Sequence, residues 1–129
     1  MNTTHACAFE DAGLQHLDHC SDSELDMLDF GVIGFDQEGF VRRYNSFESK
    51  AAGLMPVRVL GQALFTVVAP CMNNFLVAQR FEDARADGVL LDATIAYVLT
   101  LRMRPVKVNL RLLAAVGGSH RYVLVQRAA

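Results

Sequence analysis

The sequence predicts an α+β fold, with a five-stranded antiparallel sheet, helices on one side of it and an N-terminal cap. Three observations predict it: a β-hairpin pattern near residues 30–45, a helical stretch from 46 to 88, and three strand patterns after residue 90. The 129 residues are 52% hydrophobic, which suits one core. We expect a cap at residues 1–28 and a single body domain at 29–129.

The N-terminal segment has weak helical signals and an unusual charge. Ser21 or Ser23 is a candidate helix cap before "ELDML", and no strand pattern is present. Residues 1–41 hold nine of the 14 acidic residues and no Lys or Arg, so all 12 basic residues lie in 42–129. We expect the acidic cap to dock on the basic body through charge pairs that salt weakens.

Two β-rich runs, "FGVIGFD" and "FVRRYN", flank "DQEG", in which Gly39 can adopt the positive φ of a hairpin loop. The next stretch is interrupted by Gly53, Pro56, Gly61 and Pro70. These breaks predict several short helices, suited to forming the walls of a pocket.

A longer helix is predicted from a cap at Asn73 or Asn74 to Gly88. Its apolar stripe consists of Leu76, Val77, Phe81 and Ala84.

Three strands follow the long helix. "ATIAYVLTLRM" and "VKVNLRL" alternate apolar and polar residues, and "GGSH" turns the chain into "RYVLVQ". The first of these runs places one set of side chains on a single face: Ile95, Tyr97, Leu99, Leu101 and Met103.

Several classes of protein are disfavoured by composition. Three scattered cysteines do not make a disulfide framework, and the N-terminus lacks the features of a signal peptide, so we expect a cytoplasmic protein with reduced thiols. The apolar runs are far shorter than the roughly 20 residues that cross a bilayer. The basic residues are dispersed, which argues against a nucleic-acid partner.

Cys71, in "VVAPCMNNF", has no second cysteine nearby, as a redox pair or metal knuckle would need. The remaining metal-binding side chains cluster near the N-terminus in no spacing typical of structural zinc, so no metal is predicted: His5, Cys7, His16, His19 and Cys20. A thiol hydrolase needs a base, and outside the cap only His120 is available. A lone cysteine in apolar surroundings is otherwise a small core residue.

The residues "LDFGVIGFDQEGFVRRYNSFESKAAG" and "VLGQALFTVVAPC" closely resemble the photoactive yellow protein family, whose members share an F-G-x-I start, a Y-N-x-x-E turn and a V-A-P-C motif. The resemblance continues through "FED" and "ADG" to "RMRPVKV" and covers about residues 28–127. The order of elements is also that of a PAS domain, which the resemblance implies as the fold.

The resemblance implies that Cys71 carries p-coumaric acid (4-hydroxycinnamic acid) as a thioester, and that Tyr44 and Glu48 hydrogen-bond its phenolate oxygen. Pro70 should stiffen the attachment and keep Ala69 extended. If "NSFES" is helical, the spacing of four places Tyr44 and Glu48 on one helical face. A Glu48 protonated by burial would donate its proton after light-driven isomerisation, and the buried carboxylate would then drive partial unfolding.

Other pocket positions implied by the resemblance depart from the best-known members. Ala52 replaces a threonine, Leu54 an arginine, Leu99 a phenylalanine and Leu101 a tyrosine, whereas Met103, which assists return to the dark state, is retained. We infer a more apolar pocket and a colour shifted towards that of the neutral phenol.

We therefore expect a blue-light photoreceptor, not an enzyme, which signals by trans-to-cis isomerisation and proton transfer from Glu48.

In the family the N-terminal segment packs across the outer face of the sheet and detaches during signalling. Candidate charge pairs join acidic and basic residues: Asp18, Asp22, Glu24 and Asp26 with Arg102, Lys107 or Arg111. The output would pass to an unknown downstream signalling protein from a monomer or weak homodimer. The alternative is a non-photoactive PAS sensor or interaction domain that binds another small ligand or none.

Overall fold

A computed structural model describes residues 7–100 and 104–127. Five antiparallel strands form one sheet in the order β2-β1-β5-β4-β3, which confirms the predicted architecture. The strands are β1 (Gly31–Phe35), β2 (Val41–Tyr44), β3 (Leu91–Leu99), β4 (Val106–Ala114) and β5 (Arg121–Arg127). The central place of β5 brings the C-terminal end of the described chain beside the first hairpin.

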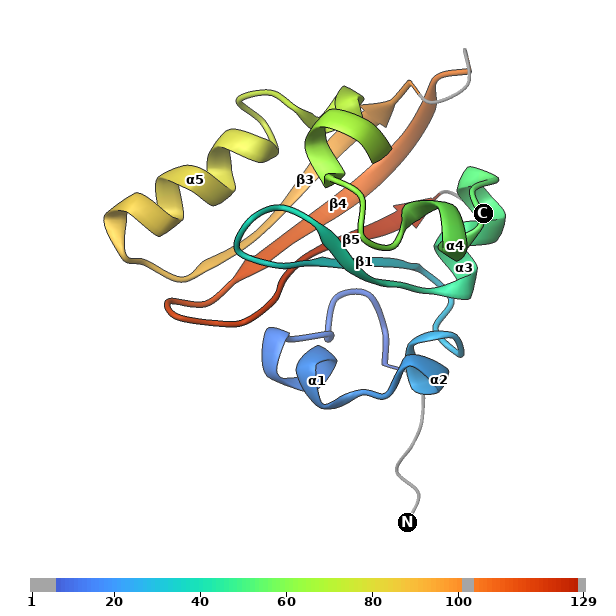
Figure 1. Cartoon of the computed structure of the whole chain (residues 1–129), viewed down its shortest axis with the longest axis horizontal. Helices are drawn as coiled ribbons and strands as arrows, with labels where there is room; N and C mark the ends of the chain where they lie inside the picture. The colour runs from blue at the N-terminus through green and yellow to red at the C-terminus, as the bar shows by residue number, and fades with distance from the viewer. Residues whose placement is uncertain (1–6, 101–103, 128–129) are drawn as a thin grey trace.

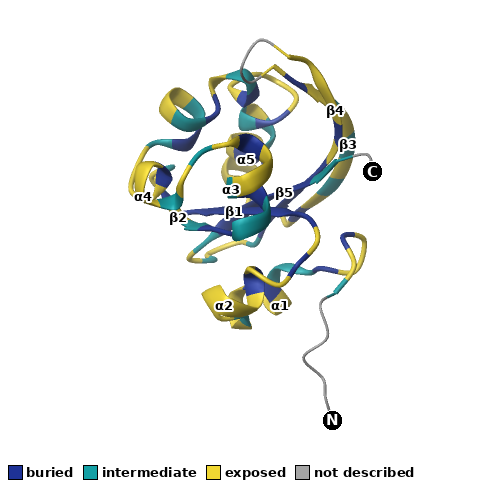
Figure 2. Cartoon of the chain, turned by 90° about the vertical axis from the view of Figure 1, so that its right-hand side faces the viewer, coloured by how far each residue is buried: buried dark blue, intermediate teal, exposed yellow. Residues whose placement is uncertain are grey.

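Seven short helical segments accompany the strands in the described residues. They are α1 (Leu14–His19), α2 (Asp22–Leu25), α3 (Ser46–Ala52), α4 (Pro56–Val59), the π-helix η1 (Leu64–Val68), the 3-10 helix η2 (Pro70–Met72) and α5 (Ala78–Asp87). Figures 1 and 2 show α1 and α2 on one side of the sheet and α3, α4 and α5 on the other. In the described residues, no helix is both long and apolar enough to cross a membrane.

The first hairpin forms as its sequence predicts. Gly39 adopts a φ of 93°, a conformation that side chains disfavour. Asp36 accepts hydrogen bonds from the backbone N–H groups of Glu38 and Phe40, both at 3.0 Å, and so closes the turn locally. These contacts fix the register that places Tyr44 at the end of β2, opposite Ile33.

The sheet separates two apolar cores. The inner core lies under α4, η1 and α5, and Phe35, Phe81 and Leu110 are among its fully buried members. The outer core joins the cap to the sheet through residues that include Leu17, Leu25 and Tyr122. Because cap side chains complete this second core, the cap is packed against the sheet by apolar burial as well as by charge.

Two arginines hold the cap through its backbone oxygens. Arg111 donates to the carbonyls of Phe9 and Glu10 at 3.0 and 3.2 Å, and also to that of Ala12. It pairs with Asp92 of β3 at 3.0 Å. Arg111 is buried, at 8% exposure. Its guanidinium thus binds Asp92 within the sheet and carbonyl oxygens of the cap.

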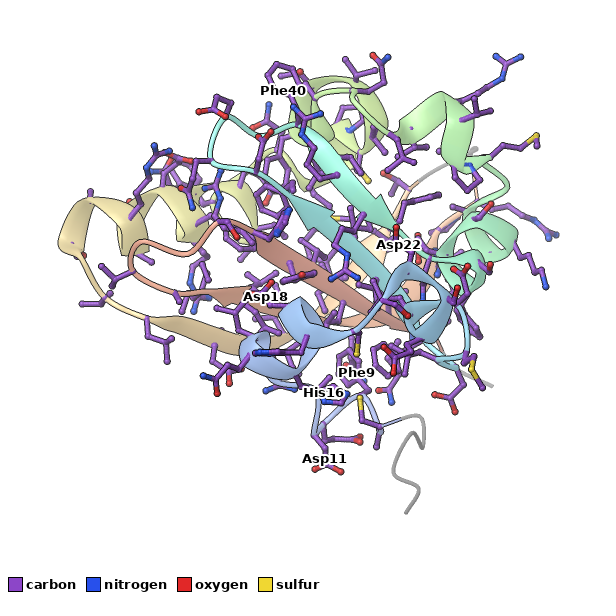
Figure 3. The ribbon with its side chains drawn as sticks, turned by 60° about the horizontal axis from the view of Figure 1, so that its bottom comes forward. Phe9, Asp11, His16, Asp18, Asp22 and Phe40 are labelled. Carbon is purple, nitrogen blue, oxygen red and sulfur yellow. The ribbon has the colours of Figure 1, made fainter. Side chains whose placement is uncertain are left out.

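The second arginine, Arg43 of β2, donates to the carbonyls of Leu17 and Cys20 and pairs with Asp22 at 3.2 Å. Asp18 instead accepts from the hydroxyl of Tyr122 at 2.8 Å. Figure 3 shows Asp18 and Asp22 on the cap, and Phe40 at the upper edge of the view.

The predicted charge pairing of the cap is thus wrong in detail. Arg111 does bind the cap, but its partners there are carbonyl oxygens rather than the four acidic side chains. Glu24 forms a capping box with Ser21, and Asp26 accepts from the N–H of Ser46. Arg102 lies outside the described residues. Salt should therefore weaken cap docking less than a set of surface ion pairs would.

The long helix begins later than predicted. Asn74 is not its cap: the carboxamide oxygen accepts from the N–H groups of Leu76 and Val77, and α5 starts at Ala78. Leu76 precedes the helix and is 57% exposed, so its place in the apolar stripe was wrong. Gly88 ends the helix in the left-handed conformation, as predicted.

Candidate functional site

Cys71 lies in η2, half-buried against the inner core. Its carbonyl oxygen accepts hydrogen bonds from the hydroxyl of Tyr97 at 2.5 Å and from the amide of Asn74 at 3.2 Å. The backbone that carries the thiol is thereby tied to β3, although the segment itself is short. This anchoring suits an attachment point that must not move.

The residues before Cys71 are only partly as expected. Pro70 is exposed and opens η2, a position where its missing N–H has no cost. Ala69 is buried with φ −136° and ψ 67°, so the prediction of an extended conformation was wrong. Its N–H donates to the Leu64 carbonyl at 2.7 Å, and that bond, rather than Pro70 alone, sets the local conformation.

Tyr44 and Glu48 do not share a helix. Tyr44 is the last residue of β2, Asn45 is the N-cap of α3, and Glu48 lies in the first turn of that helix. The prediction that the two share a helical face was wrong because the strand continues up to the cap. Both side chains are nevertheless buried, at 9% and 2% exposure.

Asn45 is the structural centre of this turn. It is 1% exposed, and its carboxamide oxygen accepts from the N–H groups of Val32 and Glu48 at 2.9 and 3.1 Å. Its NH2 group donates to the carbonyls of Leu25 and Phe30 at 2.9 and 3.0 Å. One side chain thus links β1, the helix that carries Glu48, and the cap.

Glu48 forms a buried ion pair that the sequence did not reveal. Arg127, at the end of β5, donates to both carboxyl oxygens, at 2.7 and 3.1 Å. The exposed fractions of the two side chains are 3% for Glu48 and 15% for Arg127. A two-point contact of this kind is among the stronger hydrogen-bonded ion pairs in proteins.

Gly31 makes room for this carboxyl group. A Cβ atom at Gly31 would lie 2.0 Å from Oε1 of Glu48, which is closer than atoms can approach. The β1 backbone therefore forms one wall of the Glu48 site, and only glycine fits there.

Burial governs the ionisation of both polar side chains. It raises the pKa of the Glu48 carboxyl, while the hydrogen bonds and charge of Arg127 act in the opposite direction. Burial also raises the pKa of the Tyr44 phenol, and the charge of Glu48 adds to this effect. Tyr44 is therefore a neutral phenol, and its hydroxyl has no hydrogen-bond partner among the described residues.

The remaining predicted pocket residues are partly described. Ala69 and Leu99 belong to the inner core with Tyr44, and Leu54 packs against it. Ala52 is buried in α3 at 8% exposure. Leu101 and Met103 lie outside the described residues.

An open hollow of about 1060 Å³ lies next to the site. Its lining includes Asn74 and Tyr97, which bond the Cys71 carbonyl, and Arg127, which bonds Glu48. It also runs along exposed side chains of β3 and β4, including Val98 and Lys107. The hollow thus borders the hydrogen-bond partners of Cys71 and of Glu48.

Two other chemistries weighed from the sequence find no support in this geometry. His120, the base that a thiol hydrolase would need, lies on the cap side of the sheet, 3.9 Å from Asp18 and beside Tyr122. Cys71 packs on the opposite, inner core. Within residues 7–100 and 104–127, no group of three or more His, Cys, Asp and Glu side chains is placed to hold a metal ion.

Three functional residues were missed. Asn45 had a local signal, since an Asn three residues before a Glu is typical of a helix start. Gly31 is the glycine of the F-G-x-I motif, but nothing in the sequence pointed to its contact with Glu48. Arg127 had no local signal, because 79 residues separate it from Glu48.

Comparisons with known proteins agree with this fold. No protein-family model matches the chain. It is 33% identical over 106 residues to the photoactive yellow protein of Rhodothalassium salexigens, covering 82% of this chain and 84% of that protein. It is also 33% identical over 111 residues to that of Halochromatium salexigens, covering 86% and 88%.

Solved structures give the same result. The photoactive yellow protein domain of the sensor histidine kinase Ppr from Rhodospirillum centenum superimposes with a TM-score of 0.79 at 35% identity, over 88% of this chain and 98% of that one. The PAS domain of the quorum-sensing receptor RpfR from Cronobacter turicensis has a TM-score of 0.60 at 15% identity, over 78% and 95%, and so shows the fold alone.

The five-stranded sheet and its helices, with these likenesses, define the protein as a sensor domain of the PAS type. The two photoactive yellow proteins that are 33% identical to this chain also identify its family. The chain belongs to the photoactive yellow protein family.

Proposed function

We propose that this protein is a blue-light photoreceptor that carries p-coumaric acid as a thioester on Cys71. One observation carries the proposal. A half-buried thiol, a buried phenol without a hydrogen-bond partner in the described residues, and a buried carboxyl group lie on three separate elements around one side of the sheet; they belong to Cys71, Tyr44 and Glu48.

The described residues fit such a pigment. Cys71 offers a thiol on an anchored backbone, and Leu54 and Leu99 offer apolar contact for an aromatic ring. The hydroxyl of Tyr44 and the carboxyl of Glu48 are suited to hydrogen-bond a phenolic oxygen. When bound, the pigment would supply absorption of visible light and a double bond that light isomerises.

The chain's own residues would convert that event into a signal. Glu48 holds or releases a proton at its carboxyl oxygens, and a change of charge in a buried site costs free energy. Asn45 bonds the Glu48 N–H, the Leu25 carbonyl in the cap and the Phe30 carbonyl just after it, so a shift of α3 would be transmitted to the cap. We propose that the altered cap is what a downstream signalling protein recognises.

We also propose that the bound pigment is largely a neutral phenol at neutral pH. Ala52 and Leu54 supply no hydrogen bond or positive charge, and Arg127 favours a negative charge on Glu48 instead of on the pigment. The absorption band should therefore lie towards shorter wavelength than that of the phenolate. A phenolate band alone at neutral pH would contradict this.

The proposal is tested by incubating the purified chain with p-coumaric anhydride and measuring its intact mass and absorption. We expect one p-coumaroyl group per chain and a new absorption band in the protein and in a Cys20→Ala variant, and neither in Cys71→Ala. Cys20 is a matched control because it is also half-buried and free. No adduct, or one that Cys71→Ala retains, would reject the proposal in favour of a PAS sensor domain without this pigment.

A further inference from the structure

The ion pair between Glu48 and Arg127 is the feature of the site that the proposed function leaves unexplained. The guanidinium reaches both carboxyl oxygens, at 2.7 and 3.1 Å. The pair joins the first turn of α3 to the last described residue of β5, which lie far apart in the sequence. Helix α3 is thereby held to the centre of the sheet at the residue proposed to exchange a proton.

Few other groups act on Glu48. Among the described residues, the titratable or charged side chains that face it are Tyr44 and Arg127. Tyr44 is a neutral phenol, and the β1 backbone at Gly31 closes another side. Asn45 bonds the Glu48 N–H rather than its carboxyl group. Arg127 is therefore the one cation that touches this carboxyl in the described part of the chain.

The direct contact decides where a negative charge is favoured. A guanidinium that bonds both oxygens of a carboxyl stabilises its ionised form. A phenol that reaches the same carboxyl from another side lies further from Arg127 and gains less from the cation. The ion pair therefore competes with any arrangement in which Glu48 keeps its proton and donates it in a hydrogen bond.

We propose that Arg127 is a positioning residue that controls the protonation of Glu48 and, through it, the state of a pigment bound to Cys71. Arg127 shifts Glu48 towards the carboxylate and thereby shifts a neighbouring phenol towards its neutral form. Without Arg127, Glu48 takes up a proton and becomes a hydrogen-bond donor. The statement about the pigment rests on the proposed function, whereas the statement about Glu48 does not.

The protein without pigment provides the first test, a cycle of Arg127→Gln, Glu48→Gln and the double variant, each unfolded in urea at several pH values. Arg127→Gln raises the folded-state pKa of Glu48 further above the unfolded value of about 4.3. A raised folded-state pKa gives stability that is present below the unfolded pKa and is lost as pH rises through the folded one. Each unit of further elevation changes the unfolding equilibrium constant tenfold.

We therefore expect the urea midpoint of Arg127→Gln to fall further below that of the parent protein at pH 8 than at pH 4.5. The double variant should lack this added pH dependence. Arg42→Gln is the matched control, since Arg42 bonds Asp36 at 2.7 Å with half of its side chain exposed. A pH-independent loss in Arg127→Gln, equal to that in the double variant, would overturn the proposal.

Infrared spectroscopy at pH 7 adds a direct readout that a merely structural role would not change. Arg127→Gln should gain the carbonyl stretch of a protonated carboxyl group, and the double variant should lose it. Arg127→Lys keeps a cation and should show less of this band. If Arg127→Gln shows no such band, Arg127 does not control Glu48.

Pigment loading separates the two proposals. In chains whose mass confirms the adduct, Arg127→Gln should shift the phenol-to-phenolate midpoint to lower pH by about one unit, because a protonated Glu48 can donate to the phenolate. A midpoint that stays or rises would contradict the inference. Failure of every variant to load would reject the proposed function, while the urea cycle would still decide the role of Arg127.

Discussion

Asn45→Ala should destabilise the protein more than any other substitution of a side-chain amide. The change removes the N-cap of α3, which costs about 1 kcal/mol. It also leaves the buried N–H of Val32 without its 2.9 Å partner, which costs about 1–3 kcal/mol. The carbonyls of Leu25 and Phe30 lose their donors as well. The expected loss in the free energy of unfolding is about 2–4 kcal/mol.

Urea unfolding followed by circular dichroism measures this loss. With a slope of about 1–3 kcal/mol per M for a small domain, the midpoint should fall by on the order of 1 M. Asn73→Ala is the matched control, because Asn73 is exposed and its side chain makes no hydrogen bond with the described residues. Its effect should stay within about 0.5 kcal/mol. Equal midpoints for the two variants would refute the reasoning about Asn45.

Two further predictions follow from close contacts. Gly31→Ala would place a Cβ 2.0 Å from the Glu48 carboxyl and should cost about 1–3 kcal/mol, measured by urea unfolding, whereas Gly13→Ala, with no atom within 4 Å, should cost far less. If the two variants match, Gly31 does not wall the Glu48 site. Arg111→Met removes the donor to three cap carbonyls and should speed proteolytic cleavage of the cap, followed by mass spectrometry, relative to Arg104→Met at an exposed position. Equal cleavage rates would show that Arg111 does not hold the cap.

The sequence predicted those elements whose signals are local. The hairpin could be predicted because Gly39 and Asp36 close it within a few residues, and the strands because alternation of apolar residues reports one buried face. The same local reasoning failed at Tyr44 and Glu48. A spacing of four matches a helical face only if the helix already exists at the first residue, and here the strand ends between them.

The candidate site shows the limit more clearly. Cys71, Tyr44 and Glu48 could be proposed because they lie in short motifs. Arg127 could not, since its partner is set by the strand order, which places β5 at the centre of the sheet. The cap contacts were missed for a related reason: charge counts predict attraction between side chains, whereas Arg111 and Arg43 bind backbone carbonyls that composition does not reveal.

Flash photolysis of the full chain loaded with p-coumaric acid tests the central claim most directly. Blue light should bleach the absorption band, the band should return in the dark, and the cycle should repeat on one sample. Glu48→Gln, which can neither take up nor give up a carboxyl proton, should also alter the recovery. A band that light leaves unchanged, or bleaches without recovery, would contradict the assignment of this protein as a photoreceptor.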